Sequence, residues 1–417
     1  MPPGGGRFAA AGGAAMTARQ ERLTQFFGIS LPLLGIIFST RYVIDASTRL
    51  FFTFVPQFAN GLGLSLTGFG WLMFLRAVLG ISGPIFGAAA DRFGRRQVMA
   101  LALLLQATAA ISLMFLRGWW GLFSMGLSGL SLAAFVPAQQ AYVSEQAAAR
   151  RRGRVMGAVE LSWSLTALVA SPLMGWLIEA VDWRAPLLLL AVLYGVATAV
   201  ILRLPPTAVH HSQSSLSRLE IGHLLLRKNV LASVLVAFLV YVAVTCFLTV
   251  TGVWLTVDFG LDAAALGVVS TLIGVAELAG AGASSLLIDW IGKWRGNVVG
   301  LLLLAVAFAT LPLLPSIVAL IIAMLAVTGL LFQFVIVSLL PLYAEQVIEA
   351  RGTVLALAFM GVGLGAAVGP LLTAVLWQRY QILGVSVVGV VCLLVALGLV
   401  VRFLRETAVA PVQLPNT

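Results

Sequence analysis

Long apolar stretches alternate with short polar ones along the whole chain. Each stretch is about 20 residues long, the length that a helix needs to cross a bilayer, and the chain has room for about twelve of them. The apolar runs are continuous rather than alternating, which excludes a membrane β-barrel. The fourth expected span lies between Arg117 and Glu145. The others lie near 33–58, 68–89, 98–116, 155–178, 185–203, 230–255, 264–287, 297–314, 317–340, 354–377 and 382–403.

The composition leads to the same class of protein. Apolar residues make up 61% of the chain and charged residues 10%, whereas a soluble domain has roughly half and a quarter. We therefore predict an all-α integral membrane protein. The two cysteines, Cys246 and Cys392, lie in apolar spans, so neither a disulfide framework nor a metal site is indicated. No cofactor is expected, and we interpret His210 and His211 as part of a polar linker rather than as metal ligands.

The positive charge is unevenly distributed. A net charge of +10 would suggest a nucleic-acid partner in a soluble protein. Here most of the 25 Lys and Arg residues fall in the tails and alternate loops on one side of the membrane, whereas Arg117, Arg184 and Arg379 fall on the other. Cytoplasmic loops are the ones enriched in Lys and Arg. The distribution predicts a multi-pass plasma membrane protein with both termini in the cytoplasm and no nucleic-acid partner.

The stretch GAAADRFGRR, residues 87–96, joins the second and third spans. Its small residues permit close helix approach, Asp91 ends a span, and the arginines favour a cytoplasmic loop. Such a loop is suited to latching two helical bundles together, although the arginines by themselves would also act as a topological anchor. The pattern consists of Gly87, Asp91, Arg92, Gly94, Arg95 and Arg96. These residues match the GxxxDRxGRR signature of the major facilitator superfamily, which the chain resembles.

The resemblance implies twelve transmembrane helices in two pseudo-symmetric six-helix bundles. The sequence also contains an internal repeat with an offset of 198 residues, which pairs Asp91 with Asp289, Gly94 with Gly292, Arg95 with Lys293 and Pro172 with Pro370. Two halves of this kind place a substrate cavity at their interface, near the bilayer midplane. The expected segments are a disordered cytoplasmic tail (1–29), an N-terminal bundle (30–203), a cytoplasmic linker (204–229), a C-terminal bundle (230–404) and a cytoplasmic tail (405–417).

A glycine pattern in the stretch MGVGLGAAVGP, residues 360–370, resembles the superfamily's span-5 motif. Gly361, Gly365 and Gly369 share one helix face just before Pro370. A stripe of small residues is suited to close packing against a neighbouring helix. Span 5 itself retains only part of this pattern, around Pro172.

Charged residues inside the first span are the strongest candidates for function. Arg41, Asp45 and Arg49 follow each other at intervals of four residues and therefore share one helix face. A charge near the bilayer centre costs at least ~2.5–3.5 kcal/mol, so this face should point into the bundle or into a water-filled cavity. Span 7, the counterpart in the second half, carries no charge there. Two interpretations stay open: a structural clasp around Asp45, and an anion-attracting or coupling site.

Three further charges lie inside apolar spans. Arg76 of span 2 would join the arginines of span 1 in an anion-attracting site. Glu160 and Glu277 are expected to be buried carboxylates, and a carboxylate in a low dielectric holds a proton more readily. Both are therefore candidates for proton coupling. The alternatives are an interfacial pairing of Glu160 with the arginines near 150–154 and a helix–helix hydrogen bond for Glu277.

We predict a proton-coupled secondary transporter that works by alternating access and exports a small organic molecule. This reading rests on the resemblance, which is nearest to the drug/proton-antiporter-like branch. It implies that the proton gradient supplies the energy, that the partners are the substrate and the lipid bilayer, and that the protein is a monomer. Met125 stands where proton-coupled exporters of the superfamily often have an arginine, which departs from their coupling route.

Two other functions are compatible with the sequence. One is uptake or facilitated transport of an organic anion, and the other is a membrane assembly factor or sensor without flux. The chain contains no HExxH, GxSxG or Walker loop, so it is not expected to be an enzyme. The motifs identify a superfamily and not a substrate.

Overall fold

The computed structural model describes residues 24, 26, 28–147, 151–205, 224, 226–347 and 350–406, without the side chains of residues 84, 152, 153 and 289. Most of the expected N-terminal tail and central linker, including His210 and His211, and most of the C-terminal tail lie outside these residues.

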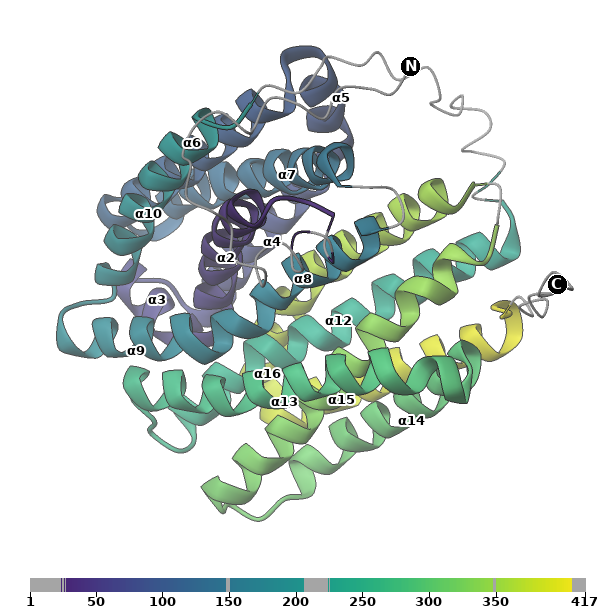
Figure 1. Ribbon diagram of the computed structural model, residues 1–417. Helices are drawn as coiled ribbons and strands as arrows, with labels where there is room; N and C mark the ends of the chain where they lie inside the picture. The colour runs from purple at the N-terminus through teal and green to yellow at the C-terminus, as the bar shows by residue number, and fades with distance from the viewer. Residues whose placement is uncertain are drawn as a thin grey trace, which may run out of the picture.

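The first half of the chain forms the helices α2 to α10 (Figure 1). Their bounds are α2 Leu31–Thr53, α3 Val55–Leu62, α4 Leu66–Gly80, α5 Gly83–Phe93, α6 Arg95–Phe115, α7 Gly121–Gln146, α8 Arg152–Leu165, α9 Ser171–Ala180 and α10 Ala185–Leu202. A 3₁₀ turn, Gly118–Trp120, precedes α7. A π-helical segment, Thr166–Ala170, joins α8 to α9.

The second half forms the helices α12 to α16. Their bounds are α12 Lys228–Val257, α13 Ala263–Ile291, α14 Lys293–Thr310, α15 Val318–Ala344 and α16 Arg351–Phe403. A 3₁₀ turn, Leu311–Leu313, follows α14. α16 is two helices in succession, because Gln381 has the non-helical angles φ 50° and ψ −140°. This break lies between the last two expected spans.

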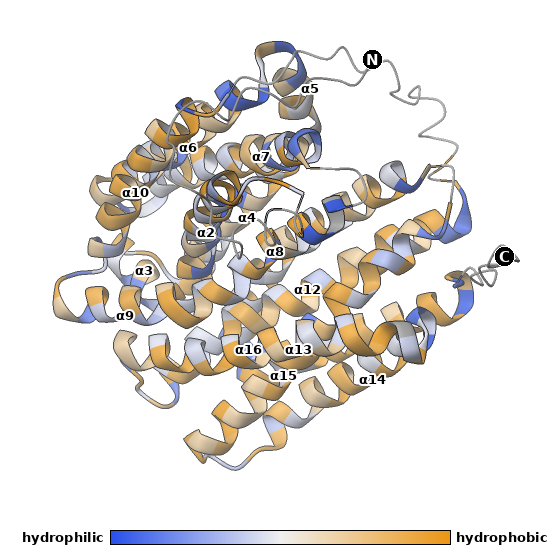
Figure 2. Cartoon of the chain, viewed as in Figure 1, coloured by the Kyte–Doolittle hydropathy of each residue, from blue (hydrophilic) through white to orange (hydrophobic). Residues whose placement is uncertain are grey.

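Nine helices among the described residues are long and apolar enough to cross a membrane. The break at Gln381 divides one of the nine, α16, into two spans. α2 is not among the nine, because its three charged residues lower its hydropathy, and α4 with α5 makes up the second expected span. Counted in this way, the described part of the chain contains the twelve expected spans. Figure 2 shows apolar residues along the helices and hydrophilic ones gathered at their ends.

The second span is not the continuous helix that the apolar pattern predicted. α4 ends at Gly80 and α5 begins at Gly83, with a proline at the start of α5. Proline has no N–H to donate and its ring clashes with the preceding turn, so it interrupts the helix there.

The two halves share local structure at the positions that the repeat pairs. Gly94 has φ 92° and ψ 137°, and Gly292 has φ 92° and ψ 139°, a conformation that favours glycine. Beside them lie the ion pairs Arg95–Glu145 and Lys293–Glu345. We call the face of the bundle that carries these two loops the motif face, and the face that carries Trp183 the opposite face.

The halves pack against each other through a pair of related contacts toward the opposite face. A Cβ added at Gly70 of α4 would lie 3.1 Å from the Ala374 Cβ and 3.4 Å from the Pro370 carbonyl oxygen of α16. A Cβ added at Gly267 of α13 would lie 2.7 Å from the Pro172 Cα of α9. Toward the motif face, α5 packs on α6 and α7 of its own half. Close backbone contact between the halves is therefore concentrated away from the motif face.

Candidate functional site

The three charged residues of α2 lie on one face and point into the protein. The exposed fractions of their side chains are 13% for Arg41, 9% for Asp45 and 3% for Arg49. The Arg41 Nε donates to both carboxylate oxygens of Asp45, at 3.0 and 3.1 Å. Ser162 of α8 donates its hydroxyl to the same carboxylate. Asp45 is thus held by α2 and α8 together.

Arg49 pairs with the other half of the protein and not with Asp45. Its Nη1 and Nη2 donate to the two carboxylate oxygens of Glu277 in α13, at 3.0 and 2.7 Å. Two parallel charge-assisted hydrogen bonds of this kind are among the strongest in proteins. The Glu277 side chain is 0% exposed. Because α2 belongs to the first half and α13 to the second, this ion pair joins the halves in the interior. Both residues were site candidates from the sequence, but their pairing was not predicted.

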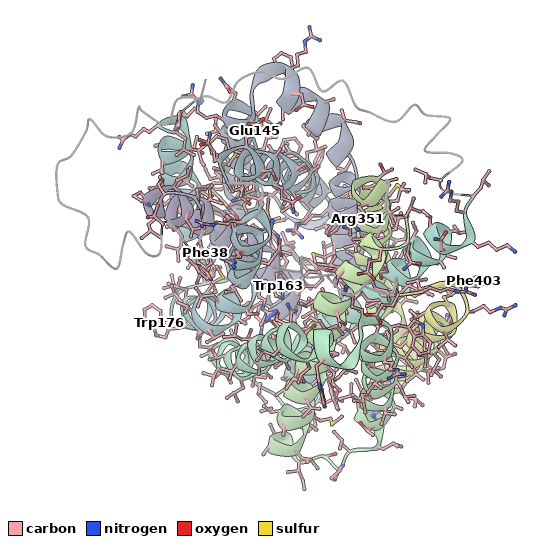
Figure 3. All side chains as sticks on the ribbon, turned by 45° about the vertical axis from the view of Figure 1, so that its right-hand side comes forward. Phe38, Glu145, Trp163, Trp176, Arg351 and Phe403 are labelled. Atoms are coloured by element: carbon pink, nitrogen blue, oxygen red, sulfur yellow. The ribbon has the colours of Figure 1, made fainter. Side chains whose placement is uncertain are left out.

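An aromatic ring covers the Arg49 guanidinium. Its central carbon lies 4.8 Å from the ring centroid of Trp163 in α8, within the range of a cation–π interaction. Figure 3 shows Trp163 near the centre of the molecule, between the halves. The π-helical segment Thr166–Ala170 begins three residues later, and such segments frequently occur at functional sites. Neither feature was expected from the sequence, although Trp163 lies well inside its expected span, away from both ends.

Glu160 is not buried, contrary to the expectation. Its side chain is 57% exposed, and its Oε2 lies 3.7 Å from the Nη2 of Arg41. Among the described residues, no arginine near 150–154 pairs with it. Tyr241 of α12, in the second half, lies within electrostatic range of both Arg41 and Glu160.

Arg76 of α4 is a buried cation with neutral partners. It is 4% exposed, and it donates from Nε to the Ser128 hydroxyl at 2.9 Å and from Nη2 to the Thr48 hydroxyl at 2.8 Å. Its guanidinium lies 5.5 Å from the ring centroid of Phe51. No carboxylate of the described residues forms an ion pair with it. A buried charge without a counter-charge is unfavourable, so this position favours a nearby anion.

Two small cavities adjoin these groups. One of about 30 Å³ lies between the halves and has space for about two water molecules. Its polar lining residues are Arg49, Thr53, Thr251 and Ser270. The other, of about 10 Å³, lies inside the first half beside Ser128 and Gln106 and has space for about one. In the described part of the chain, no group of three His, Cys, Asp or Glu side chains could hold a metal ion.

The residues of the first loop motif contact their own half. Arg95 forms ion pairs with Glu145 and, at 3.6 Å, with Asp91. Arg96 donates from Nη1 to the Leu204 carbonyl at 2.8 Å, at the end of the sixth span. None of these contacts crosses to the second half, so within the described part of the chain the expected latch is not engaged.

Gly87 of the motif makes no close approach here. A Cβ added at Gly87 would meet no heavy atom within 4 Å. Arg92 is exposed and lies over the ring of its neighbour Phe93. Among the described residues the expected close packing at Gly87 is therefore absent, whereas the close contacts between the halves lie toward the opposite face.

The second loop motif is tied in the same manner to the segment that directly follows α16. Lys293 pairs with Glu345, and the Trp294 N–H donates to the Glu406 carboxylate at 3.1 Å. Asp289 lies in the last turn of α13 before Gly292, as the repeat places it. Both loops are therefore anchored to the end of the sixth span of their own half.

The glycine stripe lies against α12 within the second half. An added Cβ would clash with the Val234 carbonyl at Gly361, with the Phe238 carbonyl at Gly365 and with the Thr245 side chain at Gly369. The stripe thus allows α12 and α16 to approach at backbone distance. It serves packing inside one half, whereas Pro370 at its end contacts the other half.

Comparisons with known proteins agree with this architecture. The family model described as Major Facilitator Superfamily matches residues 33–370 and 235–416. Solute carrier family 22 member 18 of Rattus norvegicus is 26% identical over 88% of this chain and 93% of its own. Multidrug resistance protein 2 of Bacillus subtilis (strain 168) is 30% identical over 44% of each chain. The crystal structure of the nucleoside transporter NupG superposes with a TM-score of 0.73 at 13% identity, covering 89% of this chain and 98% of that one.

Proposed function

The chain belongs to the major facilitator superfamily of membrane transporters, and from this premise we propose that it couples the export of a small organic molecule to the movement of protons. The proposed mechanism is alternating access, in which the two halves rock about a central site. The observation that carries the proposal is the buried ion pair between Arg49 and Glu277, which joins the halves.

Rocking must separate these two charges. An ion pair that loses one partner in the protein interior typically costs about 3–5 kcal/mol, because an uncompensated charge is left behind. A proton on Glu277 removes one of the charges and therefore lowers this cost. The movement of the halves then depends on the protonation of one carboxyl group, which is the requirement for coupling transport to a proton gradient.

The proposed direction of transport, export, is compatible with the orientation that the charges favour. The motif face carries Arg92, Arg95 and Arg96 and is proposed to lie in the cytoplasm, together with both chain termini. In this orientation the close contacts between the halves lie on the side away from the cytoplasm. We propose that the cytoplasmic side is the open one, from which an exporter takes up its substrate. The relative named as a multidrug resistance protein supports export. We further propose a monomer with the two bundles at 30–203 and 230–404.

The test begins with a thermal-shift screen of the purified full-length chain, since a compound that binds the native state raises its melting temperature. A compound found in this way is then offered to proteoliposomes with and without an imposed pH gradient. We expect uphill movement with the gradient in the wild type, and loss of that gradient dependence with retained binding in Glu277→Gln. Movement that ignores the gradient would contradict proton coupling, and a bound compound that never moves would favour a sensor.

Transport of an organic anion is the second candidate, and Arg76 favours it. The Arg76 guanidinium is buried without a carboxylate partner among the described residues, so it can attract the negative group of a substrate. Benzoate as the anionic probe and ethidium as the cationic probe distinguish the two. If benzoate competes with the screened compound and Arg76→Gln abolishes that competition, the anion reading is correct. If ethidium alone competes, it is wrong.

A further inference from the structure

The charged groups around α2 alternate in sign. Listed from α13 through α2 to α8, they are Glu277, Arg49, Asp45, Arg41 and Glu160, and we call this series the charge ladder. Three carboxylates share two guanidinium groups, so one carboxylate always lacks a full partner. Here that carboxylate is Glu160, which is 57% exposed and 3.7 Å from its arginine.

Each arginine of the ladder also has an unused donor. The Arg49 Nε and the Arg41 Nη1 are buried and have no hydrogen-bond partner among the described residues. Asp45 lies four residues after Arg41 and four before Arg49, so both arginines are neighbours of its carboxylate on the helix face. In this structure only Arg41 of the two arginines donates hydrogen bonds to the Asp45 carboxylate. The observed pairing is thus one of two that the ladder can adopt.

We propose that the charge ladder shifts by one position in each transport cycle, an inference that rests on the proposed function. When the halves separate at the opposite face, Arg49 leaves Glu277 and pairs with Asp45. Arg41 then leaves Asp45 and pairs with Glu160. The carboxylate without a partner is now Glu277 in place of Glu160, while both arginines stay paired.

The two ends of the ladder differ in their contact with solvent. Glu160 is exposed and can keep its charge in water when it lacks a partner. Glu277 is fully buried, and a buried carboxylate without a counter-charge is neutralised by a proton. Glu277 therefore takes one proton from water on the opposite face when Arg49 leaves. It gives up this proton to water on the motif face when Arg49 returns and the observed pair forms again.

The other groups packed around the ladder cannot replace its members. Tyr241 of α12 faces Arg41 and Glu160, and Trp163 of α8 covers Arg49. Tyr194 of α10 interacts with Asp45. These aromatic residues carry neither a carboxylate nor a cation. Within the described residues the five members of the ladder therefore determine its net charge.

The proposal predicts opposite effects for the two end residues. Glu277→Gln removes the carboxylate that pairs with Arg49 in the observed state and leaves the shifted pairing intact. The equilibrium therefore shifts toward an open opposite face. Glu160→Gln removes the one carboxylate that pairs with Arg41 in the shifted state, whereas in the observed state Arg41 keeps Asp45 and loses only the longer contact of 3.7 Å. The equilibrium therefore shifts toward a closed opposite face. We expect each variant to change the ratio of the two states by about tenfold. Two conservative changes of the same type thus have opposite signs.

The direction of each shift can be measured with a pair of spin labels on the opposite face. Asn60 of α3 and Asp258 after α12 are exposed on that face, in different halves, and accept a label pair once Cys246 and Cys392 are replaced by Ala. Double electron–electron resonance of the full-length chain in nanodiscs then gives the fractions of short and long distances. Glu160→Gln should increase the short-distance fraction and Glu277→Gln the long-distance fraction.

The control is Glu179→Gln, which changes an exposed carboxylate of α9 outside the ladder and should resemble the wild type. The ladder is wrong if Glu160→Gln matches this control or shifts in the same direction as Glu277→Gln. Proton-driven flux of the wild type tests the proposed function separately. Opposite shifts without proton-driven flux would overturn the proposed function and leave the ladder as a conformational device.

Discussion

Gly267 offers a direct test of which contacts hold the opposite face closed. A Cβ at this position of α13 would lie 2.7 Å from the Pro172 Cα and 2.8 Å from the Ser171 carbonyl oxygen of α9. These atoms belong to the backbone of the other half, so a change of rotamer cannot relieve the overlap. Gly267→Ala can therefore be accommodated only if the halves move apart at this contact.

The size of the effect follows from the cost of overpacking. Forcing an extra carbon into a well-packed interface typically costs about 1–3 kcal/mol. If this energy destabilises only the state with a closed opposite face, the ratio of closed to open states falls by about 5- to 150-fold. The overlap exists at every pH, so the shift should be the same in acidic and alkaline buffer.

Gly282→Ala is the matched control. Gly282 lies in the same helix, and a Cβ added there would meet no heavy atom within 4 Å. Both substitutions gain the same helix propensity, about 1 kcal/mol, so the control isolates the contact with α9. Distances between labels at Asn60 and Asp258 should lengthen for Gly267→Ala and stay unchanged for Gly282→Ala. Identical distance distributions for the two variants would refute the closed-face packing described here.

Two further changes test the loop motif and the charged face of α2. Asp91→Asn should alter stability by less than about 0.5 kcal/mol, because its ion pair is partly exposed, yet it should slow transport and change cysteine accessibility on both faces. Wild-type flux in this variant would exclude a latch function for Asp91. Asp45→Asn should reduce the stability by up to about 3 kcal/mol and lower the melting temperature, because Arg41 loses its carboxylate. Apolar replacement of Arg41 and Asp45 together should restore much of this loss, since Arg49 keeps Glu277 as its partner. If that double variant also transports normally, Arg41 and Asp45 form only a structural clasp.

The sequence predicted the features that depend on spacing within one helix or on the repeat. Intervals of four residues place Arg41, Asp45 and Arg49 on one face, and the observed helix has them there. The offset of 198 residues anticipates the equal backbone angles of Gly94 and Gly292. Both inferences need only helix geometry and local conformation, which a single stretch of sequence specifies.

Features that depend on how the halves meet could not be predicted in this way. Arg49 and Glu277 are 228 positions apart, and no periodicity relates a residue of one bundle to a residue of the other. The exposure of Glu160 was predicted wrongly, because its place in an apolar span does not reveal which face of the bundle is open. The π-helical segment at Thr166–Ala170 has the composition of an ordinary helix, so its sequence carried no signal.

The symmetry of the scaffold and the asymmetry of its charges suggest a division of roles. The Gly–Pro contacts and the anchored loops occur in both halves, so the scaffold by itself treats both faces in a similar way. The charge ladder takes four of its members from the first half and only Glu277 from the second. A proton on Glu277 therefore acts on one contact of an otherwise balanced pair of states. It follows that Gly267→Ala should move the equilibrium equally at every pH, whereas Glu277→Gln should remove its dependence on pH.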